Sequence, residues 1–109
     1  MAYDRTIEHR IDALIADWGN LEKKKMFGGV CYLTGGNICF GIWRDELIVR
    51  TDPATAGRLL SQEHVRPFDV TGRAMKGWLM VAAGGWPTDD DLERWLALGR
   101  DFARTLPEK

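Results

Sequence analysis

The sequence is poor in the side chains that carry out most enzyme chemistry. Its 109 residues include one serine, two cysteines and two histidines. The serine, Ser61, stands outside the Gly-x-Ser-x-Gly turn that exposes a nucleophilic serine. No complete set of nucleophile, base and orienting group can be assembled, so we expect no catalytic residue and no enzyme. A deep pocket lined by Cys31 or His64 would favour an enzyme of unknown type instead.

The residues that bind metals and cofactors are also scarce. A zinc site needs about four ligands, and His9 and His64 show no ligand-like spacing to Cys31 or Cys39. Three consecutive acids after Thr88 are explained by capping of a helix. The glycine pairs match neither the dinucleotide nor the P-loop pattern. The sequence therefore predicts no metal and no cofactor.

Long apolar runs and an excess of one charge are missing too. No run approaches the roughly 18 apolar residues of a membrane span, and the first residues lack the layout of a signal peptide. A cytoplasmic protein without membrane contact is expected. The net charge is −1, from 15 basic and 16 acidic residues, so binding of duplex DNA by this domain alone is not expected. Hydrophobic residues make up 45 %, which predicts one folded domain over residues 1–109.

What the chain does contain is two short segments in which glycines stand beside basic and large apolar side chains. The first glycine segment is Lys25-Met26-Phe27-Gly28-Gly29-Val30, and the second glycine segment is Gly72-Arg73-Ala74-Met75-Lys76-Gly77-Trp78. Glycine suits a positive φ or a close approach of the backbone. We therefore expect backbone roles for the glycines and contact roles for their neighbours.

Apolar periodicity and capping residues predict three helices. The first begins after Asp4, carries an apolar stripe from Ile7 to Trp18, and stops at Gly19-Asn20. The second has Asp52 as N-cap and runs over residues 53–61. The third is capped by Thr88 and extends to about residue 106.

The remaining apolar segments predict five strands, at residues 25–33, 37–43, 46–51, 65–70 and 77–82, with Pro67 confining the fourth to an edge or a bulge. Two-residue turns at 35–36 and 44–45 fix a register. Its predicted pairs are Leu33–Ile38, Cys31–Phe40, Ile42–Leu47 and Phe40–Val49. This register puts Cys31 and Cys39 on opposite faces, as buried thiols that do not bond to each other.

The order α-β-β-β-α-β-β-α defines the expected fold class. Hairpin connections predict an α+β fold, a two-layer α/β sandwich whose mostly antiparallel, five-stranded sheet is covered by helices on one face. If the two glycine segments meet in space, Phe27, Trp43 and Trp78 form a basic and aromatic surface with Arg73 and Lys76. Such a surface can hold a small ligand or single-stranded nucleic acid.

Four motifs in order resemble the N-terminal domain of the TfoX/Sxy family. The motifs are Met26-Phe27-Gly28-Gly29 with Val30, Leu47-Ile48-Val49-Arg50-Thr51-Asp52, the second glycine segment, and Leu92-Glu93-Arg94-Trp95-Leu96. The resemblance implies a fold similar to that of type III secretion chaperones. It also implies a link to transcription regulation in bacterial competence, where full-length members act with the catabolite activator protein at promoters. Those regulators carry a second, helical domain, so we expect this chain to act as a stand-alone single-domain member.

The function we expect is that of a non-enzymatic binding or regulatory module that acts through protein contacts, with a homodimer as one arrangement. The alternatives are the small-ligand or single-stranded nucleic-acid binder and the enzyme of unknown type. Arg50, on the sheet face away from the predicted core, is expected to reach the Arg73 loop or a partner. The candidate binding residues are Met26, Phe27, Gly28, Gly29, Arg50, Gly72, Arg73, Met75, Lys76, Gly77 and Trp78.

Overall fold

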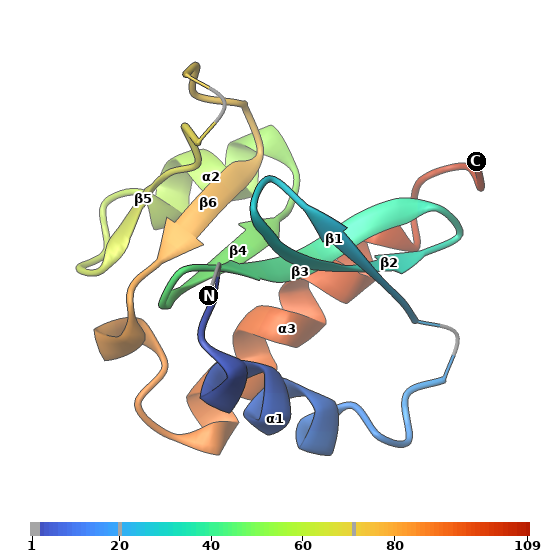
Figure 1. Ribbon diagram of the computed structural model, residues 1–109. Coiled ribbons are helices and arrows are strands. Elements are labelled where there is room, and N and C mark those ends of the chain that lie inside the picture. Colours follow the sequence, from blue (N-terminus) through green and yellow to red (C-terminus); the bar gives the residue numbers. More distant parts are fainter. Residues whose placement is uncertain (1–2, 20, 71) are drawn as a thin grey trace.

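The computed structural model describes residues 3–19, 21–70 and 72–109 of the chain. It shows an α+β fold with an antiparallel sheet (Figure 1). The helices are α1 (Arg5–Leu14), α2 (Pro53–Leu59) and α3 (Asp89–Ala103), with a short 3-10 turn η1 (Ala83–Gly85). The strands are β1 (Glu22–Met26), β2 (Gly29–Thr34), β3 (Asn37–Trp43), β4 (Glu46–Arg50), β5 (Val65–Pro67) and β6 (Trp78–Val81). Along the sheet their order is β1-β2-β3-β4-β6-β5.

The sheet has six strands, so the predicted five were wrong by one. The segment predicted as a single strand over residues 25–33 is a hairpin, in which β1 pairs with β2 around a turn at Phe27-Gly28. The first glycine segment therefore forms this turn instead of starting the sheet. Most of β1 consists of Lys23, Lys24 and Lys25, which lack apolar alternation, so its sequence did not indicate a strand. Lysines are common on edge strands, where their charge opposes pairing with another chain.

The β2–β3 register is partly the predicted one. Leu33 pairs with Ile38 around the Gly35-Gly36 turn, as expected, but Cys31 pairs with Gly41 instead of Phe40. The register shifts between Tyr32 and Leu33 because β3 contains one extra residue there, a β-bulge. The bulge exchanges the faces of β2, so that Tyr32 lies on the face on which Cys31 and Leu33 were predicted. The β3–β4 pairs Ile42–Leu47 and Phe40–Val49 are confirmed.

One face of the sheet packs against α1 and α3, which lie together below it in Figure 1. The buried side chains of this face include Tyr32, Phe40 and Val49 from the sheet. Gly99 of α3 lets the helix approach β3 closely, because a Cβ at this position would lie 2.1 Å from the carbonyl oxygen of Cys39. The second helix, α2, packs beside β6. This core fixes the strand ends from which the two glycine segments project.

All three predicted helix caps are present. The side chain of Asp4 accepts a hydrogen bond from the backbone N–H of Thr6, and Asp52 and Thr88 cap α2 and α3 in the same way. The first helix is shorter than predicted, since α1 ends at Leu14 and turns replace its last predicted residues. The predicted stop at Asn20 lies outside the described residues. None of the helices in the described ranges is long and apolar enough to cross a membrane.

The other face of the sheet carries a second apolar cluster, whose buried members are Cys31, Leu33, Ile38, Ile48, Phe68 and Met80. No helix contributes a residue to this cluster within the described ranges. It is covered instead by side chains of both glycine segments, with Phe27 from the first and Met75 and Trp78 from the second. The face away from the helices therefore depends on the two segments for its cover.

Candidate functional site

The first glycine segment is a tight hairpin turn built on left-handed backbone. Phe27 has a φ of 58° and Gly28 a φ of 79°, which are the angles that a two-residue hairpin requires. Gly29 follows in β2, where a Cβ would lie only 2.0 Å from the carbonyl oxygen of Ile42. Gly28 thus supplies a turn angle, whereas Gly29 allows β2 to approach β3. Both glycines have the backbone roles expected from the sequence.

The second glycine segment is a loop that leads into β6. Gly77 has a φ of 85°, and a Cβ at this position would lie 2.5 Å from the carbonyl oxygen of Thr51. The carbonyl oxygen of Gly77 accepts a hydrogen bond from the N–H of Thr51 at 2.7 Å. Gly72, with a φ of 91°, donates its N–H to the carbonyl oxygen of Asp69. The loop is therefore tied at both ends by backbone contacts that favour glycine.

The two segments meet through aromatic rings. The ring centroid of Phe27 lies 5.4 Å from that of Phe68 and 6.4 Å from that of Trp78, both in edge-on geometry. Phe68 and Trp78 are themselves 5.6 Å apart. Aromatic pairs at such separations add attraction beyond the burial of their area. The turn of the first segment is thus packed against the base of the loop formed by the second.

Arg50 lies beside this aromatic group, at the end of β4. Its guanidinium carbon is 5.1 Å from the ring centroid of Trp78 and 5.6 Å from that of Phe102 on α3. Burial lowers the pKa of Arg50 from its ordinary value, with a small opposing effect of Cys39. The expected approach of Arg50 to the second segment is therefore a cation–π contact with its last residue, Trp78.

Three side chains of the second segment remain outside this packing to different degrees. Arg73 and Lys76 are exposed, and Met75 is half-buried against the second apolar cluster. Trp43 is also half-buried, with the guanidinium carbon of Arg44 4.4 Å from its ring centroid. The structure therefore brings the basic loop and the tryptophans to one region, but the tryptophans are not freely exposed.

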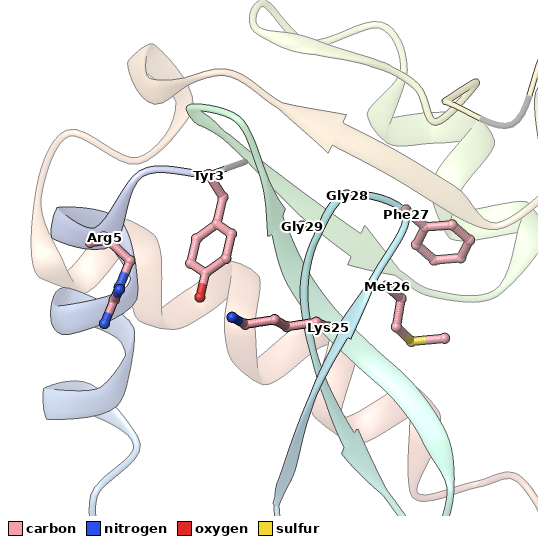
Figure 2. A pocket seen from close by; sticks show the side chains of 7 residues that line it. All are labelled: Tyr3, Arg5, Lys25, Met26, Phe27, Gly28 and Gly29. Carbon is pink, nitrogen blue, oxygen red and sulfur yellow. The ribbon is translucent and has the colours of Figure 1, made fainter. Parts of the chain in front are cut away.

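A hollow of about 410 Å³ lies between the first glycine segment and the start of the chain. Figure 2 shows its lining, in which Tyr3 and Lys25 lie on the side of the hairpin nearer α1, while Met26 and Phe27 project on the other side. Arg5 also lines it and is paired with Glu8 at 2.8 Å. Tyr3 and Arg5 were not predicted as site residues, because they belong to the chain start and not to a motif.

A larger groove of about 630 Å³ runs between α2 and the second glycine segment. Its walls come from Pro53, Ala54, Ala56, Gly57, Leu60, Pro67, Ala74, Met75, Lys76, Gly77, Trp78 and Leu79. Five of these residues belong to the second segment, whereas the contribution of α2 was not foreseen. The sequence did predict α2 as a helix, but no spacing within it showed that it faces the loop.

Groups suited to catalysis are not gathered at either hollow. The thiols of Cys31 and Cys39 are buried and unbonded, and burial raises the pKa of each to about 11, although nearby arginines oppose this weakly at Cys39. The hydroxyl of Ser61 donates to the carbonyl oxygen of Arg58. Within residues 3–19, 21–70 and 72–109, no three His, Cys, Asp or Glu side chains are grouped to hold a metal ion. The described region consists mainly of basic and apolar groups.

Comparison with known protein families identifies the family of the chain. The family model of the TfoX N-terminal domain matches residues 13–103, a stretch that includes both glycine segments, α2 and all of α3. The chain belongs to the TfoX N-terminal domain family. The resemblance inferred from the four motifs is thus confirmed, and this family is not a known enzyme family. No curated protein and no solved structure matches the chain significantly.

Proposed function

We propose that this TfoX-type domain is a non-enzymatic binding and regulatory module that acts through protein contacts. The proposal rests on how the second glycine segment is held and on which of its side chains are exposed. One end is held by the hydrogen bond from Gly72 to Asp69 and the other by Gly77 against Thr51 and Trp78 against Phe68. Arg73 and Lys76 are left exposed between them. Contacts that restrain the backbone of a loop before binding lower the entropy cost of binding.

The state of the cysteines supports a role without catalysis. A nucleophilic cysteine needs a lowered pKa and access to solvent, and both cysteines have a raised pKa and a fully buried side chain. Neither Cys31 nor His64 lines one of the hollows described above. The domain is therefore proposed to work by presenting a surface to a partner.

A protein partner suits this surface better than single-stranded nucleic acid. Bases bind by stacking on free aromatic faces. Trp78 is flanked by Phe68 and Arg50, and Trp43 is covered by Arg44. The region instead combines the exposed basic side chains of Arg73 and Lys76 with the half-buried apolar side chains of Met75 and Trp78. Protein interfaces likewise combine an apolar centre with a polar rim.

Affinity capture from the native lysate tests the proposal. The tagged wild type is compared with Arg73→Ala and with Arg94→Ala, which removes an exposed arginine from α3. We expect a protein that is captured by the wild type and by Arg94→Ala and is lost with Arg73→Ala. Equal capture by all three chains would show that the Arg73 loop is not the contact surface.

Binding to duplex DNA provides a second test. The purified domain, with its net charge of −1, is expected to bind no promoter fragment at physiological salt in a gel-shift titration. Tight binding that persists as salt is raised would contradict a mode of action through protein contacts.

A further inference from the structure

The groove between α2 and the second glycine segment, called the α2 groove below, is open and largely apolar. Its volume is about 630 Å³, and its walls include Leu60, Met75 and Trp78. Leu60 is 39 % exposed and stands out as the large hydrophobic side chain left on the described surface. Exposed apolar side chains gathered at one place and bordered by polar groups are one mark of a contact site.

Gly57 gives the α2 groove part of its depth. It lies inside α2, faces the groove, and has no atom within 4 Å of the place where a Cβ would stand. Its φ is not in the left-handed region either. Glycine weakens a helix relative to alanine, and here neither packing nor backbone geometry of the chain demands it. A side chain at this position would reduce the space available in the groove.

One basic residue lines the α2 groove, and two more adjoin its lining residues in sequence. Lys76 lines it, Arg73 precedes its lining residue Ala74, and Arg58 follows its lining residue Gly57. In the described ranges, none of these three cations forms an ion pair with an acidic side chain. The nearest acids in sequence are Glu63, which follows Arg58, and Asp69, which precedes Arg73 and pairs with Arg66. Asp52 is occupied as the cap of α2, where it accepts hydrogen bonds from Thr55. Lys76 thus supplies positive charge at the groove, with exposed Arg58 and Arg73 next to lining residues in the sequence.

The shape of the groove argues for a helix as its occupant. Addition of a strand would have to extend β5, which has three residues and ends in Pro67, a residue without an N–H to donate. One wall of the groove is a helix with small side chains at Ala54 and Gly57, and small residues allow a second helix to approach closely.

We propose that the α2 groove binds an amphipathic helix of a protein partner, with an apolar stripe seated in the groove and acidic residues along its flanks. The stripe would contact Leu60, Met75 and Trp78, and the acidic flanks would meet Arg58, Arg73 and Lys76. This inference rests on the proposed function as a protein-binding module and adds the surface and the chemistry of the partner.

A synthetic helical peptide tests the assignment. The probe is fluorescein-labelled, has leucines at i, i+4 and i+7 and glutamates on both flanks, and is titrated in fluorescence anisotropy. Two matched peptides carry lysines in place of the glutamates or serines in place of the leucines. The glutamate peptide is expected to bind the wild-type domain at least tenfold more tightly than either matched peptide. Equal binding of the three peptides would overturn the proposal.

Variants of the domain locate the binding. Gly57→Leu fills the groove while favouring the helix, so it should weaken binding at least tenfold without lowering the urea midpoint. Lys76→Glu should weaken binding about tenfold through charge, whereas Arg94→Glu on α3 should leave it unchanged. Unaltered binding by Gly57→Leu would place the peptide elsewhere and overturn the proposal.

Two further measurements would reveal a different occupant of the α2 groove. A single-stranded oligonucleotide that displaces the peptide stoichiometrically, or a dimer that Gly57→Leu dissociates in sedimentation velocity, would assign the groove to nucleic acid or to a second copy. Either result would overturn the helix proposal. Loss of lysate capture with Arg73→Ala, together with failure of the peptide to bind, would refute the groove assignment and leave the proposed function standing.

Discussion

Phe27 occupies a backbone conformation that few large residues adopt. Its φ of 58° carries a cost of roughly 1 kcal/mol for an L-residue, yet the turn retains a phenylalanine there. Contacts of the side chain offset this cost, since the ring packs against Phe68 and Trp78 and helps to cover the second apolar cluster. A single side chain thus joins the two glycine segments, which are far apart in the sequence.

Gly77 combines a positive φ with a close backbone approach, so that its replacement should be costly. Gly77→Ala keeps the φ of 85° under strain and brings a Cβ to about the position 2.5 Å from the Thr51 oxygen. We expect the free energy of unfolding to fall by about 2–3 kcal/mol. Urea denaturation measures it, with Gly57→Ala as the matched control, which should raise stability by about 1 kcal/mol. A neutral Gly77→Ala would contradict the close approach of β6 to Thr51.

The two thiols should be inert in the folded protein. Cys31 and Cys39 are fully buried, and each has a pKa of about 11, so almost no thiolate forms at pH 8. Titration with a disulfide reagent should therefore label neither cysteine in the native state and both in denaturant. Rapid labelling of one thiol under native conditions would mean that its face of the sheet is open.

At the residue scale, the sequence predicted the glycine roles well. Gly28 and Gly77 have positive φ, and Gly29 lies close to the backbone of Ile42. Such roles can be predicted because only glycine accepts these backbone conformations and distances without strain. Phe68 was predicted only as part of a strand. Its contact with Phe27 depends on how the sheet curves, which a local pattern does not contain.

At the element scale, α1 is attached to the sheet through a charged network. The ammonium of Lys23 on β1 lies 2.9 Å from carboxylate oxygens of both Glu8 and Asp12. Asp12 also accepts a hydrogen bond from the hydroxyl of Tyr32 at 2.6 Å. Glu8 is 6 % exposed, so the loss of its cationic partners would leave a buried charge.

This network should make stability fall in acid. Burial works to raise the pKa values of Glu8 and Asp12, but Lys23 and the other donors outweigh it, and both pKa values lie below the ordinary 4.5 and 3.8. A lowered folded pKa contributes stability above the unfolded value and loses it as pH falls. We expect the urea midpoint to be steady above about pH 5 and to decline below pH 4.5.

Lys23→Met tests whether the network causes that decline. Removal of the ammonium should lower stability at pH 7 by about 1 kcal/mol, since the lysine is partly exposed, and should flatten the acid decline. Lys24→Met serves as control, because this neighbouring β1 lysine forms no ion pair with α1 in the described part of the chain, and it should leave the pH profile unchanged. Identical acid profiles for wild type and Lys23→Met would refute the role of the network.

The elements themselves were predictable where capping residues or turns mark them. Asp4, Asp52 and Thr88 begin the three helices, and Gly35-Gly36 and Arg44-Asp45 make the turns that were expected. The misses have physical reasons. β1 is a lysine-rich edge strand held by pairing with β2, and the β-bulge in β3 shifts the register without a glycine or proline to mark it.

At the scale of the whole molecule, the sheet curves around its second apolar cluster. β1 and β5 lie at opposite edges, yet Phe27, at the end of β1, reaches Phe68, just after β5. This curvature brings the two glycine segments together and leaves α1 and α3 on the other face (Figure 1). The family and the α+β class could be predicted from motifs and element order. The α2 groove could not, since its walls come from distant segments.

We propose that this TfoX-type domain contacts another protein through the basic loop at Arg73. Photo-crosslinking in living cells tests it most directly, with benzoylphenylalanine placed at the position of Arg73 and, as control, at that of Arg94. We predict a protein adduct from the Arg73 position that the Arg94 position does not give. Adducts to nucleic acid alone, or the same adducts from both positions, would contradict the claim.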